Sequence, residues 1–146
     1  MKHKVLIIQG PNLNLVGIRE PGIYGDMSIT EINQRLITLG SELDTEVRVF
    51  HSNSEGGIID ELQNAMDWAD GVVINPGGYS HTSVAIRDAI AAIKLPVIEV
   101  HLSNIHSRES FRNNVVTGAK CQALIVGFGW RSYSLALRGL IEQLDQ

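Results

Sequence analysis

The stretch Pro96-Val97-Ile98-Glu99-Val100-His101-Leu102-Ser103 is the part of the sequence that most directly indicates the fold. It is short, rich in β-branched residues and opened by a proline, which is typical of a buried strand. Side chains alternate along a strand, so Glu99 and His101 project to the same face, about 6.6 Å apart along the strand axis. We therefore expect a buried strand that carries an ionisable pair near its carboxyl end.

The pair Glu99 and His101 allows two interpretations. Ionisable side chains are rarely buried without a partner. A carboxylate beside a histidine can hold the imidazole in one tautomer and favour its protonated form, which suits a general acid or base. A structural pair that caps a strand end has the same residues, and this segment alone favours neither interpretation.

Four further runs have the composition of strands covered on both faces, because each is continuous and apolar or rich in β-branched residues. With the stretch above, the expected strands are residues 5–9, 46–51, 71–75, 97–101 and 123–128. Helical patterns separate them. A capping box, Ser28-Ile29-Thr30-Glu31, opens an apolar stripe that continues to residue 43. Similar stripes cover residues 58–69, 84–93 and 133–144, and a shorter helix is expected after Ser107.

The alternation of strands and helices predicts a three-layer α/β domain with a parallel sheet. The chain has 146 residues, and no linker or repeat divides it, so we expect a single domain, 1–146. No apolar run approaches the roughly 20 residues of a membrane span. No signal-peptide cleavage pattern precedes the first strand, and we therefore expect a cytoplasmic location.

Composition narrows the range of partners. The net charge is −4 and there is no basic tract, so we expect neither nucleic acid nor an anionic membrane as a partner. The single cysteine, Cys121, excludes an intrachain disulfide and a thiolate metal cluster. The histidines lack a recognised metal-ligand spacing, so we expect no metal site.

Residues 10–27 interrupt the alternation with several glycines, two prolines and no periodicity. Structureless connections longer than about 12–15 residues tend to be functional or disordered. This one carries the polar residues Asn12, Asn14, Arg19, Glu20 and Tyr24. We predict that it forms a lid.

Polar residues gather where the expected strands end, as in Gly10-Pro11-Asn12-Leu13-Asn14 and His51-Ser52-Asn53. In open α/β sheets, ligands bind outside the carboxyl ends of the strands, so we predict a shared small-molecule site there. Gly77 and Gly78 allow the backbone to approach a ligand closely. A helix beginning near Thr82 would turn free N–H groups toward it, which favours an anion such as a carboxylate.

Three sets of residues resemble the signatures of type II 3-dehydroquinate dehydratase. The first set is Gly10-Pro11-Asn12-Leu13-Asn14 with Arg19-Glu20-Pro21 and Tyr24-Gly25, and the second runs from Asn75 to Asp88. The third is Glu99-Val100-His101-Leu102-Ser103-Asn104 with Arg108-Glu109 and Phe111-Arg112. They span essentially the whole chain in the family's order. The resemblance implies a flavodoxin-like fold with a five-stranded parallel sheet, assembled as a homododecamer of four trimers.

The resemblance also implies a reaction, the dehydration of 3-dehydroquinate to 3-dehydroshikimate through an enolate, without a cofactor. The pathway would be shikimate biosynthesis or quinate breakdown. By matched position, Tyr24 is the base, Arg19 favours its tyrosinate form, and Asn12 helps to hold a water that stabilises the enolate. His101 is the general acid, oriented by Glu99.

The remaining implied residues bind the substrate, and one of them reaches a neighbouring subunit's site. The substrate-binding residues are Asn75, His81, Leu102, Ser103 and Arg112, and the residue that reaches the neighbouring site is Asp88. Three residues and one segment depart from the family pattern: Gln9, His51, Ser132 and the approach to the last strand at Cys121-Gln122-Ala123. None carries an implied chemical role, so we expect them to affect subunit packing or loop shape.

Two alternatives remain open at this point. A Schiff-base mechanism needs a desolvated lysine, but Lys2, Lys4, Lys94 and Lys120 all lie outside the three sets. A non-catalytic flavodoxin-like module would bind a nucleotide or act as a response-regulator receiver. A receiver needs an aspartate at the end of the third strand, where Asn75 stands, and an FMN module would have a Ser/Thr-rich loop after the first strand.

Overall fold

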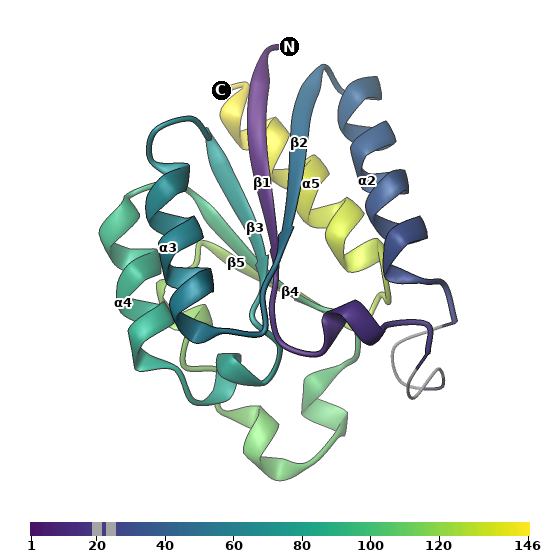
Figure 1. The fold of residues 1–146 in the computed structure, drawn as a ribbon, viewed down its shortest axis with the longest axis vertical. Coiled ribbons are helices and arrows are strands. Elements are labelled where there is room, and N and C mark those ends of the chain that lie inside the picture. The colour runs from purple at the N-terminus through teal and green to yellow at the C-terminus, as the bar shows by residue number, and fades with distance from the viewer. Residues whose placement is uncertain (19–21, 23–25) are drawn as a thin grey trace.

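The computed structural model describes residues 1–18, 22 and 26–146. Five strands form one all-parallel sheet in the order β2-β1-β3-β4-β5 (Figure 1). The strands are β1 (His3–Gln9), β2 (Thr45–His51), β3 (Gly71–Asn75), β4 (Val97–His101) and β5 (Ala123–Val126). The five predicted strands are therefore present, and the predicted α/β, flavodoxin-like architecture is confirmed.

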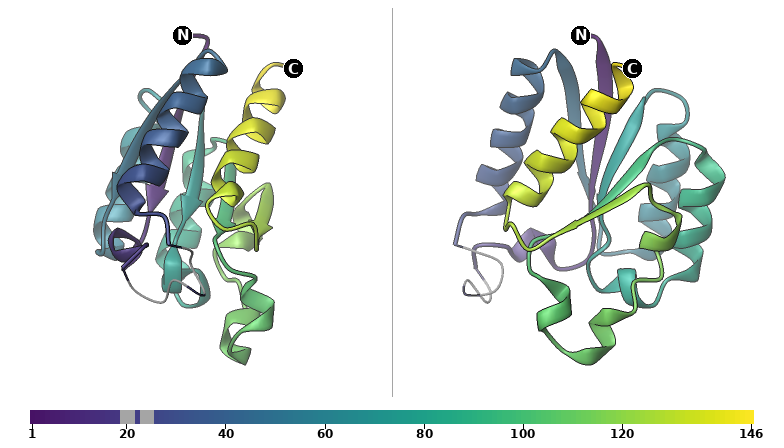
Figure 2. Two further views of the ribbon diagram at one scale, coloured as in Figure 1. Left: turned by 90° about the vertical axis from the view of Figure 1, so that its right-hand side faces the viewer. Right: turned by 180° about the vertical axis from the view of Figure 1, so that it is seen from behind.

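Helices cover both faces of the sheet, which gives the three predicted layers (Figure 2). On one face lie α2 (Ile29–Glu42) and α5 (Arg131–Leu144), and on the other lie α3 (Glu55–Ala65) and α4 (Val84–Ile93). None of the helices in the described part of the chain is long and apolar enough to cross a membrane.

Successive side chains of β1 point to opposite faces of the sheet and so belong to two separate parts of the hydrophobic core. Val5 and Ile7 pack with α2 and α5, whereas Leu6 and Ile8 pack with α3 and α4. All four side chains are almost completely buried. A strand buried on both faces has no polar side, which explains why the sequence of β1 is continuously apolar rather than alternating.

Three of the long helices begin at a serine that caps them. Ser28 Oγ accepts a hydrogen bond from Glu31 N at 3.2 Å, as the capping box predicts. Ser54 and Ser83 cap α3 and α4 in the same way. Each serine satisfies an N–H group that the first helical turn would leave unpaired, and so fixes where the helix begins.

The structure differs from the expected elements at the last strand. Residues 123–128 were expected to be a strand covered on both faces, but β5 ends at Val126, and Ala123 and Leu124 are exposed. This strand lies at the edge of the sheet, with β4 as its neighbour, so its apolar residues are less completely covered than those of the central strands. Gly127 has φ +93°, outside the extended region, and ends the strand.

Smaller differences concern the helices. The helix expected after Ser107 is replaced by two 3₁₀ turns, η3 (Ile105–Ser107) and η4 (Ser110–Asn113). Met66 and Val84, which the apolar stripes include, are exposed. The predicted lid over residues 10–27 contains the 3₁₀ turn η1 (Leu13–Leu15), and part of it lies outside the described residues. Its role as a lid stays a prediction.

Candidate active site

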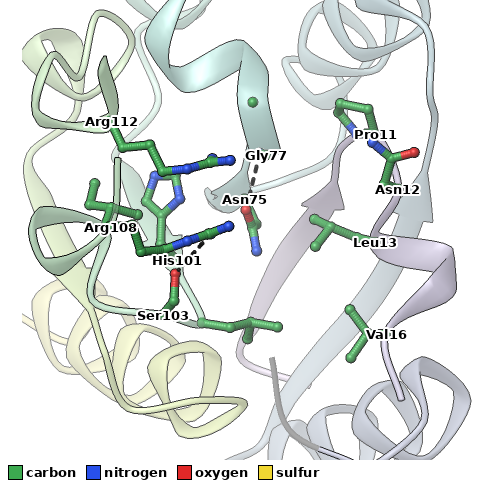
Figure 3. Close-up of a pocket in the computed structure, with 13 residues that line it drawn as sticks. Pro11, Asn12, Leu13, Val16, Asn75, Gly77, His101, Ser103, Arg108 and Arg112 are labelled. Atoms are coloured by element: carbon green, nitrogen blue, oxygen red, sulfur yellow. Dashed lines mark hydrogen bonds between the residues drawn. The ribbon is translucent and has the colours of Figure 1, made fainter. Parts of the chain in front are cut away.

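A cavity of about 130 Å³ lies at the carboxyl ends of β1, β3 and β4. The chain leaves β1 toward β2 on one side and returns on the other side as β3, so this edge is the topological switch point where α/β sheets bind ligands. Figure 3 shows His101, Ser103, Arg108 and Arg112 across the cavity from Pro11, Leu13 and Val16. The lining residues are Pro11, Asn12, Leu13, Val16, Asn75, Gly77, Gly78, His101, Leu102, Ser103, Ile105, Arg108 and Arg112.

The loops after β1 and β3 meet closely at one side of this cavity. Gly77 has φ +60°, and a Cβ built on it would lie 3.1 Å from the carbonyl oxygen of Pro11. Asn12 also has a left-handed conformation, φ 69°, and its N–H donates to Asn53 Oδ1 at 2.9 Å. A non-glycine residue in this region is uncommon and is often found at functional sites. The fold therefore holds Asn12 in a constrained position at the cavity wall.

The predicted pair on β4 forms a direct contact. His101 Nε2 donates to Glu99 Oε2 at 2.8 Å, and both side chains are buried. The Glu99 carboxylate also accepts hydrogen bonds from Ser80 Oγ at 2.7 Å and from Thr117 Oγ1 at 2.5 Å. With Nε2 engaged by Glu99, Nδ1 is the ring nitrogen of His101 left for a bound molecule.

Two arginines give the cavity positive charge. The guanidinium groups of Arg108 and Arg112 are mostly buried, and both approach the carboxylate of Glu109, at 3.6 and 3.0 Å. Arg108 Nη1 also donates to Ser103 Oγ at 3.3 Å (Figure 3). One carboxylate between two guanidiniums leaves a net positive charge, and planar guanidiniums match the geometry of a carboxylate ligand.

His81 lies behind this group of residues. Its ring stacks on that of His101 with 6.1 Å between the ring centroids, and its Nδ1 donates to the carbonyl oxygen of Asn114 at 3.0 Å. Burial lowers the pKa of His81 from its ordinary value, although the hydrogen bond to Asn114 opposes that shift. Near neutral pH the ring is therefore uncharged, with Nε2 as a hydrogen-bond acceptor.

The structure brings most of the predicted site residues together. Three of them do not line the cavity: Glu99 lies behind His101, His81 stacks on His101, and Asp88 is exposed on α4. Arg19 and Tyr24 lie outside the described residues. The predicted residues that line the cavity are Asn12, Asn75, His101, Leu102, Ser103 and Arg112.

One sequence interpretation of the anion site was wrong. The helix expected near Thr82 begins at Val84 as α4, and Ser83 caps its first turn instead of leaving it open toward a ligand. The 3₁₀ turn η2 (Gly77–His81) separates α4 from the cavity. Gly77 and Gly78 do line the cavity, as their predicted role requires.

Arg108 lines the cavity, although the third set of residues predicted no role for it. Its four-residue spacing from Arg112 was the available signal. The apolar wall of Leu13, Val16 and Ile105 was also missed. Nothing in its local sequence distinguishes it from ordinary core.

Comparison with known proteins identifies the family of the chain. The sequence profile of class II dehydroquinase matches residues 3–141. The chain belongs to the class II dehydroquinase family. It is 50% identical over 142 residues to the 3-dehydroquinate dehydratase of Prochlorococcus marinus, covering 97% of this chain and 98% of that protein. The Campylobacter jejuni enzyme of the same name is 50% identical over 143 residues, 98% of this chain and 90% of that one.

Solved structures agree with this assignment. The crystal structure of the type II dehydroquinase from Butyrivibrio crossotus superposes with a TM-score of 0.93 at 44% identity, covering 94% of this chain and 97% of that one. Membership of the class II dehydroquinase family makes this chain an enzyme. The alternative of a non-catalytic flavodoxin-like module is therefore wrong.

Proposed function

We propose that this class II dehydroquinase binds 3-dehydroquinate in the cavity described above and removes water from it to give 3-dehydroshikimate. The observation that carries the proposal is the buried pair of Glu99 and His101. His101 lines the cavity, and two arginines line the same cavity. An acid for the leaving group and an anion site for the substrate carboxylate are thus adjacent. The names of the relatives from Prochlorococcus and Campylobacter support the choice of substrate.

His101 acts as the general acid in this proposal. When the imidazole is protonated, Nε2–H remains with Glu99 and Nδ1–H is available to the departing hydroxyl group. The buried carboxylate holds Nε2–H in a hydrogen bond and so fixes the orientation of the ring. As the C–O bond breaks, its electron pair leaves with the oxygen, the proton from Nδ1 completes a water molecule, and the enolate collapses to the conjugated ketone.

Tyr24 acts as the base that removes the proton beside the ketone. A tyrosine with the ordinary pKa of about 10 is ionised in roughly one molecule in a thousand at pH 7, a cost near 4 kcal/mol. A close cation lowers an acid's pKa by about 1–3 units, which is the role proposed for Arg19.

The other two tyrosines support this choice because they are engaged elsewhere. Tyr79 donates its hydroxyl proton to the carbonyl oxygen of Asn53 at 3.1 Å. Burial raises the pKa of Tyr133 well above its ordinary value, which makes its phenol a poor source of phenolate. Neither residue lines the cavity.

The remaining polar groups bind the substrate or the enolate. Arg108 and Arg112 receive the carboxylate, together with Ser103 and the backbone of Leu102. Asn75 and His81 bind hydroxyl groups, and Asn12 holds a water molecule that stabilises the enolate oxygen. A Schiff-base route is disfavoured because no lysine of the chain, all four being described, lines the cavity.

We further propose that the chain is a single catalytic domain that assembles as a homododecamer and acts in the cytoplasm, in the shikimate pathway or in quinate breakdown. Asp88 is exposed on α4 and lies outside its own subunit's cavity. That position is compatible with a contact to the site of a neighbouring subunit. Light scattering of the purified protein would test the assembly.

The function is tested by adding 3-dehydroquinate to the purified protein without metal or cofactor and following the ultraviolet absorption of the conjugated enone. We expect turnover by the wild type and the loss of most of kcat in Tyr24→Phe and in His101→Ala, with the fold retained by circular dichroism. Folded wild-type protein without turnover would overturn the proposed activity. Near-normal turnover of either variant would overturn the role assigned to that residue.

A further inference from the structure

The side-chain amide of Asn75 is held by two hydrogen bonds of opposite direction. Asn75 is the last residue of β3, is 2% exposed, and lines the cavity. Its Oδ1 accepts the N–H of Gly77 at 3.1 Å (Figure 3). Its Nδ2 donates to the phenol oxygen of Tyr133 at 3.1 Å. One N–H of the amide remains for a bound molecule.

Tyr133 is the first of two buried residues behind this amide. It lies on α5 and is completely buried, and burial raises the pKa of its phenol, which therefore keeps its proton. The phenol oxygen accepts from Asn75 Nδ2. The side chain of Gln9 makes a second hydrogen bond to the phenol, and both bonds oppose the effect of burial on its pKa.

Gln9 is held from the other side by a reciprocal pair of amide hydrogen bonds. Its Nε2 donates to Oδ1 of Asn33, on α2, at 2.7 Å, and Nδ2 of Asn33 donates to Gln9 Oε1 at 3.4 Å. Gln9 is completely buried, and it pairs in register with Asn75 across β1 and β3. Residues of β1, β3, α2 and α5 thus meet in one group of hydrogen bonds that ends at the cavity.

We infer that Tyr133 is a positioning residue that, with the N–H of Gly77, holds Asn75 so that it presents an N–H donor, and not its carbonyl oxygen, to the substrate. In the flipped amide, the Asn75 nitrogen would face the N–H of Gly77, and two donors would oppose each other. Gly77 therefore selects the orientation, and the phenol oxygen of Tyr133 keeps the amide in place by accepting one of its N–H groups. The other N–H suits a substrate hydroxyl or carboxylate oxygen as acceptor.

The inference rests on the proposed function, in which Asn75 contacts the substrate. Tyr133→Phe keeps the aromatic ring and removes the hydroxyl. We expect KM for 3-dehydroquinate to rise about tenfold with kcat changed by less than about twofold, the pattern of lost uniform binding. The matched control is Thr45→Val, which removes a buried hydroxyl that donates to the carbonyl of Leu43 at the opposite end of the sheet. It should lower the melting temperature to a similar extent without changing KM.

A double-mutant cycle separates positioning from general loosening of the structure. In an Asn75→Ala background, Tyr133→Phe should change KM by less than about twofold, because the group it positions is absent. An unchanged KM in the single variant, or an equal increase in both backgrounds, would overturn the inference. If Tyr133→Phe does not fold, Gln9→Leu takes its place in the same cycle, with the same expected coupling.

The failure of the proposed function has a different signature. Folded wild-type protein with no turnover would overturn the activity, and the inference would fall with it. Active wild-type protein with an uncoupled cycle would overturn the inference alone.

Discussion

Thr117 Oγ1 donates a hydrogen bond of 2.5 Å to Oε1 of Glu99, and both residues are completely buried. Ser80 connects the segment that carries Thr117 to Glu99 a second time. Its carbonyl oxygen accepts the N–H of Val116 at 2.7 Å, and its hydroxyl donates to Glu99 Oε2. Loop residues on either side of β4 thus supply the carboxylate with donors, and its remaining contact is His101. A buried carboxylate is tolerable only when it is satisfied in this way.

We predict that Thr117→Val lowers kcat about tenfold. The substitution keeps the shape of the side chain but removes a hydrogen bond to a buried charged group, which is worth about 1.5–3 kcal/mol. Glu99 is then free to shift, and His101 with it. Thr117→Ser restores the hydroxyl and should recover most of kcat, as steady-state kinetics would measure. Equal kcat in the valine variant and the wild type would show that this hydrogen bond does not support the acid.

Loss of either cavity arginine should weaken substrate binding. We expect Arg108→Met and Arg112→Met each to raise KM about 10- to 100-fold, the equivalent of one charge-assisted hydrogen bond. Methionine preserves much of the aliphatic side chain. Arg48→Met is the matched control, because Arg48 pairs with Glu46 on the exposed side of β2, away from the cavity. A cavity variant with the KM of this control would remove that arginine from the carboxylate site.

Adjacent glycines at the cavity should respond differently to alanine. Gly77 has φ +60° and packs against Pro11, so Gly77→Ala should lower the free energy of unfolding by about 1–2 kcal/mol. Apart from Gly78 itself and its chain neighbours, no described residue has an atom within 4 Å of a Cβ added at Gly78, and Gly78→Ala should change that free energy by less than about 0.5 kcal/mol. Urea denaturation of the two variants measures the difference. Equal stabilities would contradict the left-handed conformation of Gly77.

His81 should make the protein less stable at acid pH. Burial lowers its pKa in the folded state, so between that value and the ordinary value of about 6.5 the unfolded chain binds more protons. The contribution of His81 to stability is complete above pH 6.5 and is lost as the pH falls through its folded pKa. His81→Asn, which can keep a donor near the carbonyl of Asn114, should show a shallower loss of urea midpoint between pH 6.5 and 5. A slope as steep as that of the wild type would assign the acid sensitivity to other groups.

Local sequence patterns were sufficient for most of the architecture. Continuous apolar runs predicted five strands, and β3 and β4 begin and end at the predicted residues. The capping box located the start of α2. Such patterns succeed because strand and helix periodicity depend on residues that are near one another in the chain. The last strand was predicted less well, since its place at the sheet edge depends on the order of all five strands.

By itself, the sequence determined the alternation of strands and helices, the collection of polar residues at the strand ends, and the placement of Glu99 and His101 on one face of a strand. The tertiary structure alone decided which distant groups complete the site. Asn75 and Tyr133 are 58 residues apart, and Glu99 receives its hydroxyl donors from 18 and 19 residues away. No local period relates such positions, because their contact arises only when β3, β4, α5 and the intervening loops pack against one another.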